Sequence, residues 1–152
     1  MGQDEKYTEA MLMIQWLRQK HPLPANYQIS LEILPETGVW CGRYKRKKVA
    51  GACYAKPSEA RIVLAGKRAL AGILKTVAHE FKHILQTVEG CGLKKHGKAR
   101  ERKADEFAEK VYPVYLEERY PEAPAGVQAH LETMLYLFRL DQELERIRAS
   151  AV

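Results

Sequence analysis

Two histidines stand four positions apart in the run from His79 to His83, which reads HEFKH. On an α-helix this spacing places both imidazoles on one face, where they can bind the same metal ion. Glu80 lies beside them, where its carboxylate can take a proton from a water molecule activated by that metal. The run therefore predicts a metal-dependent hydrolytic site, with His79 and His83 as ligands and Glu80 as the catalytic base.

A zinc ion in a hydrolytic site has three protein ligands and one open position for water. Glu101 and Asp105 stand four positions apart farther along the chain, again on one helical face. We assign Glu101 as the third ligand, and we expect Asp105 to accept a hydrogen bond from the far nitrogen of a ligand histidine. The less favoured third ligand is His96, which lies in a basic run typical of a solvated loop. In a simpler interpretation, both carboxylates are surface charges paired with Arg102 or Lys103.

The two motifs together resemble the gluzincin branch of zinc metallopeptidases, and most closely the compact ImmA/IrrE type, through His79-Glu80-x-x-His83 and Glu101-x-x-Ala104-Asp105-x-Phe107-Ala108. The resemblance covers about residues 26–113. It implies a zincin-like α+β domain, in which a small twisted sheet packs with the zinc helix and with a second helix that carries a Glu ligand. It also implies a zinc-dependent endopeptidase that acts on protein or peptide substrates.

Two other functions remain open at this point. An SprT-like protease acting near nucleic acid would take its third ligand from His96. A non-catalytic interaction module would use zinc only for stability, but such closed sites favour four protein ligands that include cysteine. The cysteines at 41, 53 and 91 show no paired-ligand spacing. A structural site also has no need of Glu80, so we favour the enzyme.

A helix over residues 67–89 should carry the two histidines. Its apolar side chains recur at helical spacing and form one stripe that faces the core. His79 and His83 lie nearly opposite this stripe and share their face with Thr76 and Gln86. The stripe consists of Leu70, Ile73, Leu74, Val77, Phe81, Ile84, Leu85 and Val88.

The other elements follow from periodicity and from the positions of proline and glycine. We expect one domain over residues 1–152, because this length supports a single core. Besides the zinc helix, it should contain an N-terminal helix over 5–20, a sheet over about 26–65, a ligand helix over 98–119 and a C-terminal helix over 125–148. The wide apolar face of the last helix either covers the core or docks a partner.

Two further roles can be assigned from position. In zincin-like folds the strand along the cleft is an edge strand, with which an extended peptide can pair. The β-rich run 61–65 directly precedes the zinc helix, so we expect it to be this edge, with substrate contacts at Ile62, Val63 and Leu64. Tyr112 shares a helical face with Glu101 and is our candidate donor to the oxyanion, with Tyr115 as a weaker one.

Composition is that of an ordinary globular protein, with 46% hydrophobic residues and a net charge of +6. Basic residues cluster at 43–48 and 94–103, and we interpret both clusters as solvated loops, so a nucleic-acid partner is not favoured. No apolar run approaches the roughly 20 residues that span a bilayer, and no secretory signal is visible. The odd number of cysteines fits a reducing compartment, so we expect a cytoplasmic enzyme without a membrane partner. Nothing in the sequence indicates the oligomeric state.

Overall fold

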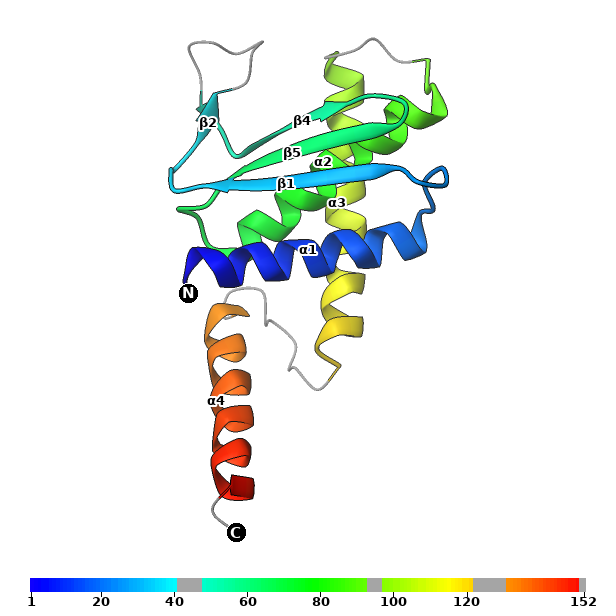
Figure 1. Ribbon diagram of the computed structural model, residues 1–152. Coiled ribbons are helices and arrows are strands. Elements are labelled where there is room, and N and C mark those ends of the chain that lie inside the picture. Colours follow the sequence, from blue (N-terminus) through cyan, green and yellow to red (C-terminus); the bar gives the residue numbers. More distant parts are fainter. Residues whose placement is uncertain (41–47, 93–96, 122–130, 151–152) are drawn as a thin grey trace.

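The structure, a computed structural model, describes residues 1–40, 48–92, 97–121 and 131–150 (Figure 1). The mixture of helices with a small sheet confirms the α+β class expected from the sequence. In chain order the elements are α1 (Gln3–Lys20), β1 (Gln28–Leu34), β2 (Val39–Trp40), β3 (Lys48–Val49), β4 (Gly51–Ala55), β5 (Glu59–Ala65), α2 (Leu70–Glu89), α3 (Lys98–Arg119) and α4 (Leu131–Ser150).

Strand β5 lies at the centre of the three-stranded sheet, whose order is β1-β5-β4. It runs parallel to β1 and antiparallel to β4, so both of its edges are occupied. Its side chains are buried on both faces, with Ile62 and Leu64 in the main core and Val63 packed with Val39 and Ala52 on the other face. The expectation that 61–65 is the substrate-binding edge is therefore wrong. The backbone groups of Ile62, Val63 and Leu64 already pair with β1 and β4.

Strand β4 is the edge of this sheet within the described part of the chain. Lys56 N–H donates to the carbonyl of Glu59 at 2.8 Å, and Ala65 N–H donates to the carbonyl of Ala50 at 2.9 Å. In an antiparallel pair, the residues whose backbone groups face the partner alternate with those whose groups face away. Even-numbered positions of β4 therefore bond to β5. The outward-facing backbone groups are those of Gly51, Cys53 and Ala55.

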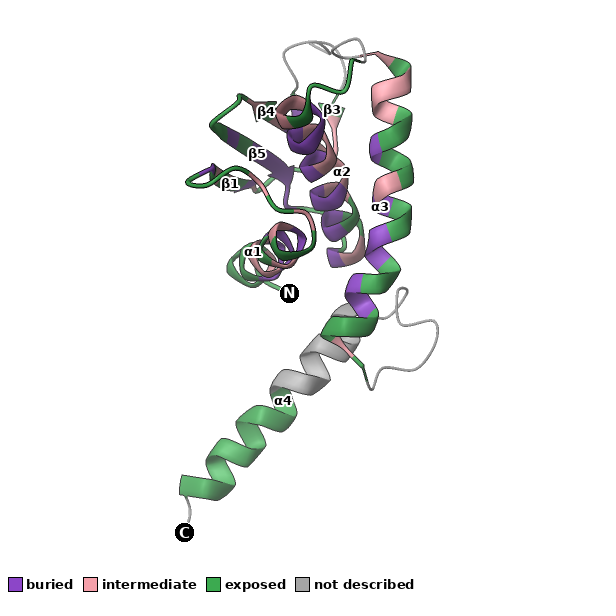
Figure 2. Cartoon of the chain, turned by 90° about the vertical axis from the view of Figure 1, so that its right-hand side faces the viewer, coloured by how far each residue is buried: buried purple, intermediate pink, exposed green. Residues whose placement is uncertain are grey.

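Helix α2 lies between the sheet and α3 (Figure 2), and half of its 20 residues are buried. The predicted apolar stripe is buried from Leu70 to Leu85, while Val88 is only half-buried. The helix begins at Leu70, three positions later than expected, because Ala69 is still extended, with ψ of 146°. Lys67 N–H donates to the carbonyl of Glu36 at 2.9 Å. It ends at Glu89, and the Gly90 that follows caps it with a left-handed φ of 62°, which suits a residue without a Cβ.

The other helices lie where the sequence predicts them, with small shifts at some of their ends. Helix α1 begins at Gln3, and α3 has the expected bounds of Lys98–Arg119. Helix α4 is described from Leu131, and the expected start at 125 lies outside the described residues. Its residues 140–150 are exposed and extend away from the sheet (Figure 1), so this half does not cover the core. None of the described helices combines the length and apolar character needed to cross a membrane.

Candidate metal centre

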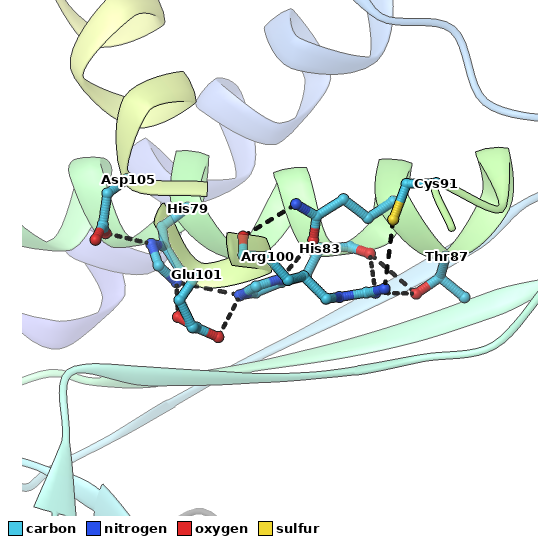
Figure 3. Close-up of polar contacts among 8 residues, drawn as sticks. His79, His83, Thr87, Cys91, Arg100, Glu101 and Asp105 are labelled. Atoms are coloured by element: carbon cyan, nitrogen blue, oxygen red, sulfur yellow. Dashed lines mark hydrogen bonds and ion pairs between the residues drawn. The ribbon is translucent and has the colours of Figure 1, made fainter. Parts of the chain in front are cut away.

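Helices α2 and α3 bring the three predicted ligands together (Figure 3). Nε2 of His79 lies 3.0 Å from Oε2 of Glu101, and Nε2 of His83 lies 3.0 Å from Oε1 of the same carboxylate. The two Nε2 atoms are 3.2 Å apart. One ligand atom from each residue therefore points to a common point, which is the arrangement that a metal ion with two imidazole ligands and one carboxylate ligand requires.

The far nitrogen of each imidazole also has a partner. Asp105 Oδ1 lies 2.8 Å from Nδ1 of His79, so the hydrogen bond expected from the sequence is present. Gln86 Oε1 lies 2.9 Å from Nδ1 of His83, a contact that sequence reasoning missed. Its signal was the position of Gln86 nearly one turn after His83 on the polar face. Burial lowers the pKa of His83, which favours the neutral imidazole that a metal ion needs.

Glu80 is buried, with 5% of its surface exposed, yet it lines the same cleft as the two histidines. Burial raises the pKa of its carboxyl to about 7, and the Glu101 carboxylate acts in the same direction, against the opposing effect of His79. A carboxylate that must exchange a proton near neutral pH works best with a pKa close to that pH. The position of Glu80 therefore suits a general base.

The cleft has a volume of about 800 Å³ and runs between β4 and the two helices. Strand β4 forms one wall over its whole length, and α2 and α3 form the other wall with the three candidate ligands. At one end β4 touches α2, because a Cβ added to Gly51 would lie only 2.6 Å from Cγ2 of Thr76. The candidate ligands thus face the edge strand of the sheet across this cleft.

Tyr112 does not reach the cleft. Its side chain is 1% exposed and belongs to the main core, and its hydroxyl finds no hydrogen-bond partner among the described residues. Burial raises the pKa of this hydroxyl to about 12. Tyr115 is also buried, with its ring 5.3 Å from that of Trp16 on α1. The structure therefore brings neither tyrosine to the position of an oxyanion donor.

The alternative third ligand, His96, lies outside the described residues. Cys53 faces the cleft from β4, and burial raises the pKa of its thiol far above the ordinary range. Such a thiol is a poor metal ligand, since the thiolate is the form that binds. Among the residues described, one group of histidine, cysteine and acidic side chains converges closely enough to hold a metal ion, namely His79, His83 and Glu101.

Comparison of the chain with models of known protein families, with curated proteins and with solved structures gave no match. The resemblance to gluzincins therefore rests on the two motifs and on the convergence of their side chains.

Proposed function

We propose that this protein is a zinc-dependent endopeptidase with a zincin-like fold of the gluzincin type. The observation that carries the proposal is the meeting of His79, His83 and Glu101 at one point beside the buried carboxyl of Glu80. The edge strand β4 runs along the same cleft and offers a place for an extended peptide.

The donor set fits a zinc ion. Asp105 is an exposed carboxylate that only accepts hydrogen bonds, so it holds the ring proton of neutral His79 on Nδ1. The lone pair on Nε2 then faces Glu101, which is also an acceptor. A cation satisfies both groups at once. The two Nε2 atoms are 3.2 Å apart, which approaches the roughly 3.3 Å edge of a tetrahedral zinc site with bonds of about 2.05 Å. Each Nε2 also lies 3.0 Å from one oxygen of the Glu101 carboxylate.

A zinc ion at this point would supply Lewis acidity, which makes water a better nucleophile and polarises the scissile carbonyl. Glu80 would take the proton of the attacking water and pass it to the leaving amine. Its carboxyl is buried yet lines the cleft, so it can meet a water molecule held beside the ligands. A non-catalytic zinc module would have no use for a buried carboxyl at this place.

Substrate would bind along β4. The outward-facing backbone groups of Gly51, Cys53 and Ala55 can pair with an extended peptide and hold its scissile carbonyl over the ligands. Pairing of this kind holds residues on both sides of the scissile bond, which an endopeptidase requires. It also demands little of the substrate's side chains.

The proposal is tested by metal analysis of the purified protein together with cleavage of a peptide library, comparing the wild type with Glu80→Gln. We expect one zinc ion per chain in both proteins. Glu80→Gln should lose about 10²- to 10⁴-fold in cleavage rate, the usual scale of general-base catalysis. Cleavage by Glu80→Gln as fast as by the wild type would contradict the proposed mechanism. A wild type that binds no zinc would contradict the proposed function.

A further inference from the structure

Gln86 has a buried amide side chain, with 2% of its surface exposed. It lies on α2 nearly one turn beyond His83, and both polar atoms of its amide are used. Oε1 lies 2.9 Å from Nδ1 of His83, and Nε2 donates to the backbone carbonyl of Arg100 at 3.1 Å. Arg100 directly precedes Glu101 on α3, so Gln86 connects the helix of two candidate ligands to the helix of the third.

The orientation of this amide is determined by its second contact. A backbone carbonyl can only accept a hydrogen bond, so the amide nitrogen of Gln86 must face Arg100. The amide oxygen must then face His83, and because this oxygen is also only an acceptor, Nδ1 of His83 must carry the ring proton. In a neutral imidazole with its proton on Nδ1, Nε2 has a free lone pair. That lone pair points toward Glu101 and the candidate metal position.

A reciprocal contact crosses the same two helices. The guanidinium of Arg100 donates to the carbonyl of His83 at 3.3 Å and to Oγ1 of Thr87 at 2.8 Å. This contact holds α2 and α3 together but does not touch the His83 ring. Arg100 therefore provides an internal control, since its side chain shares the helix-to-helix role of Gln86 without the contact to an imidazole nitrogen.

We infer that Gln86 is a positioning residue that prepares His83 for metal binding, by fixing the ring proton on Nδ1 through an amide that the Arg100 carbonyl orients. The inference rests on the proposed metal site and deepens it. The two histidines thus have different partners at Nδ1. The partner of His79 is an exposed carboxylate, and that of His83 is a buried amide.

The test compares Gln86→Met, Gln86→Glu and Arg100→Met in the full chain. Zinc affinity is measured by competition with a chromophoric chelator, and the tautomer of His83 is read from long-range ¹H–¹⁵N NMR spectra of the metal-free protein. Gln86→Met should lose the Nδ1–H signature and bind zinc about 10- to 100-fold more weakly, the usual effect of removing such a partner. Gln86→Glu keeps an acceptor beside Nδ1 but loses the donor to the Arg100 carbonyl, so it should retain more of the tautomer and of the affinity than Gln86→Met does.

Arg100→Met should keep the tautomer and stay within about threefold of wild-type affinity, although its thermal midpoint falls. Equal losses of zinc in Arg100→Met and Gln86→Met would overturn the inference, because Gln86 would then act only by packing the helices. Unchanged affinity and tautomer in Gln86→Met would also overturn it. If the wild type binds no zinc, the proposed function fails, and the tautomer in the metal-free variants still decides the role of Gln86.

Discussion

Gly51 on the edge strand β4 and Thr76 on α2 approach so closely that no side chain fits between them. A Cβ on Gly51 would lie 2.6 Å from Cγ2 of Thr76 and 3.2 Å from the carbonyl oxygen of Val63. Thr76 cannot easily rotate away, because its hydroxyl donates to the carbonyl of Gly72 at 2.8 Å. This contact sets how far β4 stands from the candidate ligands at that end of the cleft.

Gly51→Ala should therefore displace β4 and reduce peptide cleavage more than zinc binding. We expect a loss of about 1–3 kcal/mol in the free energy of unfolding, the usual cost of overpacking. Thr76→Ser removes the methyl group that the new Cβ would strike, so the double variant should recover part of both losses. Denaturant unfolding and peptide cleavage measure the two effects. Equal cleavage by Gly51→Ala and the wild type would show that the position of β4 does not matter to the substrate.

The edge of β4 can be tested with proline, which lacks the N–H that pairs with a strand. Cys53→Pro removes an outward-facing N–H, so it should abolish peptide cleavage while zinc content and thermal midpoint stay near those of Cys53→Ala. Tyr54→Pro removes an N–H that bonds to β5, so it should unfold the domain. Normal cleavage by Cys53→Pro would exclude β4 as the substrate-binding strand.

The third ligand can be identified by alanine substitution and metal analysis. Glu101→Ala should lose most of the zinc, whereas His96→Ala should retain it. Asp105→Ala should weaken affinity by about 10- to 100-fold, because the His79 ring loses the partner that orients it. Glu106→Ala, an exposed carboxylate next to Asp105, serves as the matched control. Loss of zinc from His96→Ala alone would replace Glu101 with His96 and favour the SprT-like interpretation.

Glu80 should make the metal-free protein less stable as the pH rises. Burial raises its pKa from the ordinary value of 4.5 to about 7. Between these values the folded chain holds a proton that the unfolded chain releases, so stability is highest below pH 4.5 and falls until about pH 7. The total loss is on the order of 3 kcal/mol.

Glu80→Gln should lack this decline, while Glu109→Gln, an exposed carboxyl on the same cleft, should show it in full. The measurement is denaturant unfolding at a series of pH values with a chelator present. Parallel stability curves for the wild type and Glu80→Gln between pH 5 and 7 would contradict the raised pKa.

The convergence of His79, His83 and Glu101 could be predicted because it depends on local geometry. Helical spacing fixes which side chains share a face, and a short connection forces two successive helices to lie beside each other. The contact between Asp105 and His79 followed from the same spacing. These features need no knowledge of the rest of the fold.

The order of the strands could not be predicted in this way, because it depends on contacts between distant segments. The run 61–65 did carry a signal: apolar residues follow one another without alternation, which is typical of a strand buried on both faces. An edge strand beside a solvent-filled cleft more often alternates. The apolar run was therefore better evidence for a central strand than its position before the zinc helix was for an edge.

Tyr112 shows where helical spacing stops being informative. It shares a face of α3 with Glu101, as predicted, but the two residues lie three turns apart along the helix. Over that distance the same face passes from the cleft to the core, because α3 extends beyond the end of the cleft. Helical spacing shows in which direction a side chain points from the helix axis. It does not show what packs against the helix at that position along the axis.

All the side chains that would hold or orient the metal lie between His79 and Asp105, whereas the wall that would receive the substrate lies in β4, well before them in the chain. Mutations that reshape the wall therefore leave every ligand intact, and mutations among the ligands leave the wall intact. In the course of evolution, the proposed substrate-binding wall and the proposed metal site can consequently change at separate rates within this one fold.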